Sequence, residues 1–241
     1  MIILLFAQVV LSQVDNKPIQ EFSRATQGSS DGTIVKNAGD HLSPSRGFFG
    51  VNRRYNIRLS EVLFNNISDF TILHFRKSPS WGGESVLAIE MDTAHYRKKM
   101  RNREFKGNPD YTIVYQRALG SIYHSLREDS LKIEIEKFRS HIDEESVNLL
   151  RKLWREALKR ISKPDKIGID GTGYNFGGFL GVEEGRTHSP REGTKMAELV
   201  SISNELISLT KANKRRIRFD SELTERINKL IERFLLEDEL D

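Results

Sequence analysis

Residues 70–77 read Phe-Thr-Ile-Leu-His-Phe-Arg-Lys, and residues 84–91 read Glu-Ser-Val-Leu-Ala-Ile-Glu-Met. Both runs are rich in the apolar and β-branched residues that favour strands. The six residues between them are Ser-Pro-Ser-Trp-Gly-Gly, which are mostly turn formers. Two such runs joined by a turn-rich segment predict a β-hairpin, and we expect its strands to belong to an antiparallel sheet with one buried face.

Other strand candidates lie on both sides of this hairpin. Residues 55–59 alternate between apolar and polar side chains, and residues 130–138 do the same over a longer run. Residues 111–116, Tyr-Thr-Ile-Val-Tyr-Gln, also favour a strand, although the apolar residues that continue to position 126 equally fit one face of a helix. The basic stretch at 93–109 is poor in aliphatic residues and predicts a loop.

The C-terminal half has the periodicity of amphipathic helices. Apolar residues recur at spacings of three and four in three segments, and each segment has a residue that suits an N-cap or a helix end. The predicted helices cover residues 144–161, 194–211 and about 223–234, with Asp143 capping the first and Asp220 or Ser221 the last. Strands followed by helices predict a single α+β domain over residues 47–241, its sheet built largely from residues 50–140.

The first residues of the chain resemble an export signal in length and polarity. Residues 2–12 form an apolar run too short to span a bilayer, and we interpret residues 1–13 as a signal peptide. Residues 14–46 have the polar, Gly- and Ser-containing composition of a flexible segment, which favours this interpretation. No Lys or Arg precedes the run, so a buried strand in a cytoplasmic protein is the alternative. We expect an exported protein, periplasmic or secreted, without a membrane span.

The composition restricts the chemistry that this protein can perform. The 241 residues include no cysteine, which excludes disulfides, thiolate metal sites and cysteine nucleophiles. The formal net charge is only +4, but cations gather in residues 97–106 and 211–218. Exposed loops and helix ends account for most such runs, so nucleic-acid binding is not favoured, and binding to nucleic acid or an anionic surface through these runs stays an alternative.

The glycine-rich segment at 170–193 combines turn residues with aromatic ones. Its glycine spacing matches neither the dinucleotide fingerprint nor the phosphate-binding loop, and aromatic, strand-like residues follow where a helix would be needed. Turn chemistry at 170–173 and aromatic residues beside it predict a hairpin instead. Within it, Gly177 and Gly178 would allow a bulge or the close approach of another group.

The same segment carries the most varied polar side chains of the chain. A histidine near a hydroxyl and carboxylates can act as a general base, so the candidates for catalysis are His188, Asp170 and Glu183. The candidates for ligand binding are Tyr174, Arg186, Thr187 and Ser189. Ser189 to Glu192 also matches a helix capping box with Pro190 at the first position, which would explain these residues without catalysis.

No metal or cofactor is expected. The six histidines are isolated from one another, and no ligand spacing typical of a metal site occurs. The sequence therefore favours an exported binding or interaction protein for an unknown ligand or protein partner, with no cofactor. A hydrolase-like enzyme that uses His188 with a nearby carboxylate is the alternative.

Overall fold

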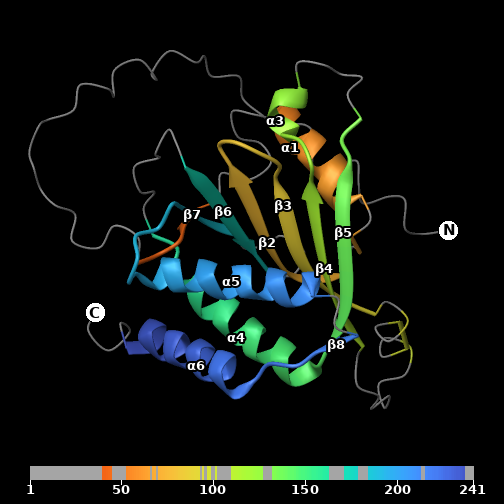
Figure 1. Ribbon diagram of the computed structural model, residues 1–241. Helices are drawn as coiled ribbons and strands as arrows, with labels where there is room; N and C mark the ends of the chain where they lie inside the picture. Colours follow the sequence, from red (N-terminus) through yellow and green to blue (C-terminus); the bar gives the residue numbers. More distant parts are fainter. Residues whose placement is uncertain are drawn as a thin grey trace, which may run out of the picture. The chain divides into compact units, whose positions relative to one another are not determined.

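The structure is a computed structural model (Figure 1). It describes residues 40–44, 53–65, 67–68, 70–92, 94, 97–98, 101, 110–126, 132–162, 171–178, 184–212 and 215–236, all within one compact unit. The signal peptide predicted for residues 1–13 lies outside the described residues.

An eight-stranded sheet forms the centre of the fold, in the order β1-β7-β6-β2-β3-β4-β5-β8 (Figure 1). Neighbouring strands run antiparallel except β5 and β8, which are parallel. The strands are β1 Ser43–Pro44, β2 Thr71–Pro79, β3 Ser85–Met91, β4 Tyr111–Ala118, β5 Ile135–Ile142, β6 Thr172–Gly177, β7 Glu184–His188 and β8 Arg216–Ile217. The two outermost strands, β1 and β8, are only two residues long. The helices are α1 Arg53–Leu59, which continues into the π-helical turn η1 Ser60–Phe64, then α3 Ile122–Ser125, α4 Glu144–Lys159, α5 Lys195–Lys211 and α6 Ser221–Leu235.

The predicted single α+β domain is confirmed, and so is the hairpin of β2 and β3 from which the prediction started. Phe75 pairs with Leu87, and Leu87 pairs with Tyr115 on β4, so apolar side chains line up on one face. We call this the core face, because α4 and α5 pack on it and α6 packs against both helices (Figure 1). Each large apolar side chain buried there contributes about 1.5–3 kcal/mol of stability.

The three predicted C-terminal helices are confirmed, together with the two predicted caps, Asp143 and Asp220. The side chain of Asp143 accepts a hydrogen bond from the amide of Ser146 at the start of α4. Asp220 does the same for Leu223 at the start of α6, and Thr194 caps α5. The capping box that begins at Ser189 is wrong, because a turn at Gly193, with φ of 81°, separates that residue from the helix.

The glycine-rich segment forms the predicted hairpin, as β6 and β7. It joins the same sheet through β2, so the sheet extends well beyond residues 50–140. Residues 40–44 also belong to the fold, although they fall within the segment expected to be flexible. Leu42 is fully buried, and Ser43 pairs with Arg186 on β7.

The opposite face of the sheet, the second face, is covered by α1, η1 and α3. Leu59 and Leu63 from the helical segment pack with Val86, Ala118 and Ile122 in a small separate cluster. This helix corrects the sequence analysis, which predicted a strand at residues 55–59. Apolar alternation over five residues also fits one turn and a half of helix, and the apolar side chains that recur at helical spacing up to position 63 decide the outcome.

Two other boundaries differ from the prediction. Strand β5 begins at Ile135, five residues later than predicted, and ends at Ile142. After β4 only Ile122–Ser125 is helical, so residues 111–118 form a strand and not the first part of a long helix. No helix in the described ranges has the length and hydropathy needed to span a lipid bilayer.

Candidate binding site

A cavity of about 420 Å³ lies on the second face, beside the junction of α1 and η1. Strand pairing explains one wall, because Gln116 on β4 lies opposite Lys137 on β5 and both side chains project to the second face. The helical segment forms the other wall, fixed to the sheet by Leu59 and Leu63. The cavity is lined by Arg58, Glu61, Val62, Asn65, Gln116, Lys132, Ile133, Ile135 and Lys137.

Gln116 is the most informative residue of this cavity. It is only 2% exposed, and its Nε2 atom has no hydrogen-bond partner among the described residues. An unsatisfied buried amide costs about 1–3 kcal/mol, and native folds rarely retain one without a reason. The Nε2 atom is shielded in this conformation, and a turn of the side chain toward the cavity would let a polar ligand accept the hydrogen bond that the protein leaves unmade.

Positive charge predominates around the cavity. Three of the lining side chains are cations and one is a carboxylate, Glu61, which pairs with Arg58 at 3.4 Å. Burial and the nearby Arg139 guanidinium lower the pKa of Lys137, and only Glu90 opposes them. Because Glu90 already accepts a hydrogen bond from Arg139, its charge is partly compensated. An anion in the cavity would therefore be electrostatically favourable.

The buried carboxylate of Glu84 connects α1 and α3 on the second face. Glu84 is 2% exposed and accepts hydrogen bonds from the Tyr55 hydroxyl at 3.1 Å, the Ile122 amide at 2.7 Å and the Tyr123 amide at 3.2 Å. Burial of Tyr55 and its contact with Glu84 raise the pKa of the tyrosine well above its usual range. The tyrosine therefore stays protonated and ties α1 to the start of α3.

The site residues proposed from the sequence are not gathered in one place. Asp170 and Glu183 lie outside the described residues. Tyr174 and Thr187 are cross-strand partners on the core face, where the Tyr174 ring stacks on Phe75 at 5.8 Å between centroids. Arg186 projects to the second face, opposite Asn175.

His188 and Ser189 lie where β6 and β7 meet at one end of the hairpin. His188 pairs with Gly173, and the Ser189 hydroxyl accepts a hydrogen bond from the Thr172 amide at 3.0 Å. The Ser189 amide in turn donates to the Thr172 carbonyl at 3.0 Å. These two bonds close the strand pair at this end. Ser189 has a left-handed φ of 39° there.

The fold also brings together a pair that the sequence analysis missed. His74 Nε2 on β2 lies 3.6 Å from Glu184 Oε1 on β7, with both side chains largely buried. Between them passes β6, where Gly177 pairs with both residues and leaves room for the imidazole ring. The prediction of a close approach at Gly177 thus holds, but the partner depends on strand order, which no local pattern reveals.

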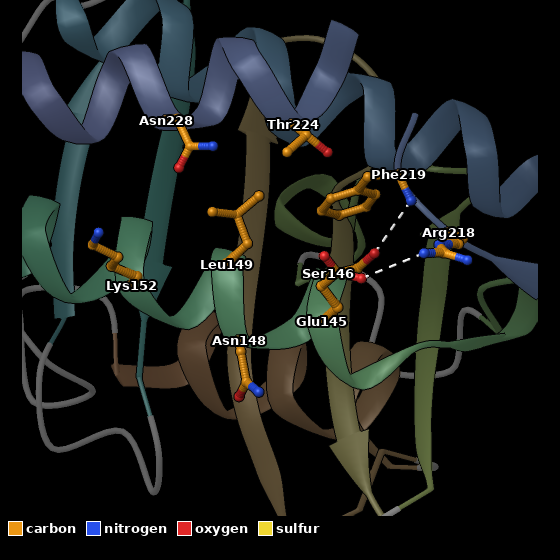
Figure 2. Close-up of a pocket in the computed structure, with 9 residues that line it drawn as sticks. All are labelled: Glu145, Ser146, Asn148, Leu149, Lys152, Arg218, Phe219, Thr224 and Asn228. Atoms are coloured by element: carbon orange, nitrogen blue, oxygen red, sulfur yellow. Dashed lines mark hydrogen bonds and ion pairs between the residues drawn. The ribbon is translucent and has the colours of Figure 1, made fainter. Parts of the chain in front are cut away.

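A second cavity of about 400 Å³ lies between α4 and α6 (Figure 2). Its polar groups connect the two helices to each other. The Ser146 hydroxyl donates to Asp143 at 2.8 Å and accepts from the Phe219 amide at 3.2 Å, and Arg218 pairs with Glu145 at 3.5 Å. None of the buried polar atoms that lack a partner lines this cavity, so we assign it a structural origin.

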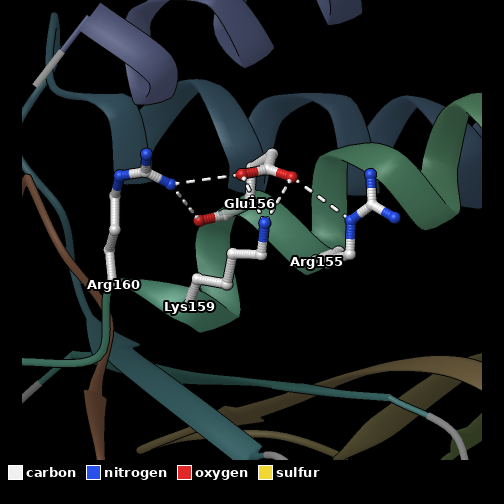
Figure 3. Close-up of polar contacts among 4 residues, drawn as sticks. All are labelled: Arg155, Glu156, Lys159 and Arg160. Atoms are coloured by element: carbon white, nitrogen blue, oxygen red, sulfur yellow. Dashed lines mark hydrogen bonds and ion pairs between the residues drawn. The ribbon is translucent and has the colours of Figure 1, made fainter. Parts of the chain in front are cut away.

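Another groove, of about 370 Å³, follows the basic side of α4 and is lined partly by Arg151, Lys152 and Arg155. Further along the helix, Glu156 is 3% exposed and accepts from Arg155 at 3.2 Å, Lys159 at 3.2 Å and Arg160 at 3.4 Å (Figure 3). Burial raises the pKa of Glu156, but the hydrogen bonds and the nearby cations lower it by more, so the pKa lies below its ordinary value. The cluster neutralises a buried carboxylate.

The two basic runs provide little support for nucleic-acid binding. Of the first run, only residues 97, 98 and 101 are described. In the second, Lys211 lies 3.9 Å from Glu136 and Arg218 lies 3.5 Å from Glu145. Within the described part of the chain, no three His, Asp or Glu side chains are close enough together to hold a metal ion.

The fold and the cavity define an α+β protein with a small, positively charged cavity on the second face of its sheet. Comparisons do not extend this description: no family model matches the chain, and neither curated proteins nor solved structures give a match.

Proposed function

We propose that this protein is a binding protein that holds a small anionic molecule in the cavity beside η1. The unpaired Nε2 of the buried Gln116 carries the proposal, because a turn of this side chain toward the cavity would let a ligand oxygen satisfy the donor. The neighbouring Lys132 and Lys137 supply charge for a carboxylate or phosphate group. The volume is at the small end of the range typical of ligand sites, which are about 300–1,000 Å³.

Binding is favoured over catalysis by the residues that line the cavity. They include no serine, threonine or histidine, and their one carboxylate, Glu61, is paired with Arg58. A hydrolase-like enzyme centred on His188 is supported less well, because the Ser189 hydroxyl accepts a hydrogen bond from the Thr172 amide within the strand pair.

We also propose that the protein is exported. An apolar run at residues 2–12, followed by a polar segment, supports removal of residues 1–13 and a role outside the cytoplasm. Intact-mass measurement on the protein purified from its native host tests this, and an N-terminus near Gln13 or Val14 is expected. Recovery of the uncleaved chain from the cytoplasm would contradict export without affecting the binding proposal.

The binding proposal is tested with a panel of carboxylated and phosphorylated small molecules. At least one is expected to raise the melting temperature, because a ligand that binds only the folded state stabilises it. Calorimetry should then show that Lys137→Gln weakens binding by about tenfold, since one charge-assisted contact is worth about 1.4 kcal/mol or more. Gln116→Leu should also weaken binding, yet leave the free protein as stable as the wild type, because the substitution removes an unsatisfied donor.

Lys152→Gln, in the groove along α4, is the matched control and should bind like the wild type. If no anion in the panel stabilises the protein at low salt, or if Lys137→Gln and Lys152→Gln bind equally well, the assignment of this cavity is wrong.

A further inference from the structure

Large apolar side chains that line none of the cavities described above are exposed at one end of the sheet. The four residues concerned are Ile57, Trp81, Leu119 and Tyr123, with exposed fractions of 47%, 80%, 58% and 51%. They come from α1, the β2–β3 turn, the segment after β4, and α3. We refer to these four residues as the apolar tip.

Ring contacts and backbone packing place these segments together. The Trp81 ring stacks on His124 with centroids 6.2 Å apart, and Tyr123 packs edge to face on Tyr55 of α1 at 5.8 Å. A β-carbon at Gly83 would lie 3.3 Å from the carbonyl oxygen of Gly120, so the β2–β3 turn touches the segment that carries Leu119. Figure 1 shows α1 and α3 beside each other at this end of the sheet.

The backbone under the apolar tip is held by hydrogen bonds. Ser80 donates to the Gly171 carbonyl through both its amide and its hydroxyl, each at 2.8 Å, and the hydroxyl accepts from the Gly171 amide at 3.0 Å. The Leu119 amide donates to the Glu134 carbonyl at 2.9 Å. The exposed side chains are therefore presented by ordered turns, and keeping them in water forgoes stabilisation that burial would give.

Basic side chains accompany the apolar tip. Arg54 lies on the exposed side of α1, Arg117 is the next-to-last residue of β4, and Lys132 precedes β5; all three are exposed. The exposed Glu134 lies on the segment that is hydrogen-bonded to Leu119, the partly buried Glu136 pairs with Arg117 across the strands, and Glu84 is buried and bonded to α3. Among the described residues of this region, exposed cations thus outnumber exposed carboxylates.

We propose that the apolar tip docks on a lipid bilayer that carries anionic headgroups; none of its four side chains lines the anion cavity, although Lys132 borders both sites. Trp and Tyr favour the boundary between headgroups and hydrocarbon, Leu and Ile enter the acyl region, and nearby Arg and Lys attract anionic lipid. A protein segment would favour a groove, and none of the three cavities described above is lined by a residue of the tip. Few side chains insert, so the binding is reversible and weakens as salt rises.

Intrinsic fluorescence provides a direct test on the full chain. Of its two tryptophans, Trp154 is 3% exposed in the core and Trp81 is 80% exposed, so a change in solvent contact reports Trp81. Vesicles of phosphatidylcholine with phosphatidylglycerol should shift the emission to shorter wavelength and allow quenching by brominated lipid. Vesicles of phosphatidylcholine alone should give a much smaller shift.

Variants separate docking from a general effect on the fold. Trp81→Ala and Leu119→Ser should each lower co-sedimentation with anionic vesicles by about tenfold, because each removes a large inserted side chain. Leu236→Ser is the control, since Leu236 is 61% exposed at the far end of α6, and it should bind like the wild type. Circular dichroism confirms that each variant is folded.

Three results would overturn the proposal. The first is the absence of both a fluorescence shift and co-sedimentation with anionic vesicles at low salt. The second is equal binding by Trp81→Ala, Leu119→Ser and Leu236→Ser. The third is an emission shift that grows with protein concentration without lipid, or that a single-stranded oligonucleotide produces instead, because the tip would then bind a second copy of the chain or nucleic acid.

Discussion

Replacing Gly177 with alanine should destabilise the fold through one neighbour, His74. A β-carbon at position 177 would lie 2.7 Å from Nδ1 of His74 and closer still to Cε1 and Nε2, and these are its three nearest atoms. The ring would have to withdraw by roughly 1.5 Å to reach ordinary contact. It lies between Glu184, 3.6 Å away, and the edge of Phe64, 5.9 Å away between centroids, so there is little room to move.

The size of the effect follows from two opposing contributions. Overpacking of this kind costs about 1–3 kcal/mol. Alanine in a strand recovers about 0.5–1 kcal/mol relative to glycine, because glycine loses more backbone freedom on folding. Gly177→Ala should therefore lower the free energy of unfolding by about 1–2 kcal/mol.

A double-mutant cycle shows whether His74 is the cause. In a His74→Ala background, Gly177→Ala should cost nothing or stabilise the protein by about 0.5 kcal/mol, which makes the coupling about 2 kcal/mol. Urea unfolding followed by circular dichroism measures all four proteins, and similar slopes would indicate that the denatured state is unchanged. The same loss in both backgrounds would refute the reasoning, because the cost would then arise from the backbone of β6.

Two further predictions concern ionic contacts. Glu156→Gln should cost about 1–2 kcal/mol at neutral pH, because the neutral amide interacts more weakly with the three surrounding cations, two of which are more than half exposed. The pKa of Glu156 in the folded protein is below its ordinary value of 4.5, so this contribution is present above pH 4.5 and is lost as the pH falls through the folded pKa. The free energies of unfolding of the variant and the wild type should therefore converge in acid, and a constant difference would contradict this. Arg226→Met should cost about 1 kcal/mol, because Arg226 joins α6 to Glu198 at 2.8 Å and Glu205 at 2.6 Å on α5, and an undiminished difference in high salt would exclude an ionic origin.

Local sequence patterns were sufficient for the long elements of the fold. The helices α4, α5 and α6 have apolar residues at helical spacing over more than three turns, and side-chain caps at Asp143, Thr194 and Asp220 define where they begin. The α1 segment was too short for periodicity to distinguish helix from strand. Tertiary packing of Leu59 and Leu63 on the second face determined its structure.

The candidate site could not be predicted, because strand pairing creates it. Gln116 is an unremarkable residue near the end of a strand until β5 places Lys137 opposite it and η1 completes the cavity that both line. The same holds for His74 and Glu184, which are separated by more than 100 positions in the sequence and joined by the order of β2, β6 and β7. The glycine-rich segment did predict a close approach at Gly177, but the residue that approaches it, His74, comes from β2.

The short outermost strand β8 leaves part of the edge of the sheet accessible to a second copy of the chain. Since β8 pairs only with His141 and Ile142, it leaves most of β5 without a strand partner on that side among the described residues. That open edge carries Glu136, Lys137 and Arg139, so a second chain adding there would have to match or bury charges of both signs. Charged edge strands hinder the edge-to-edge pairing that leads to aggregates. The charges along this edge of β5 therefore oppose the addition of a second copy of the chain there.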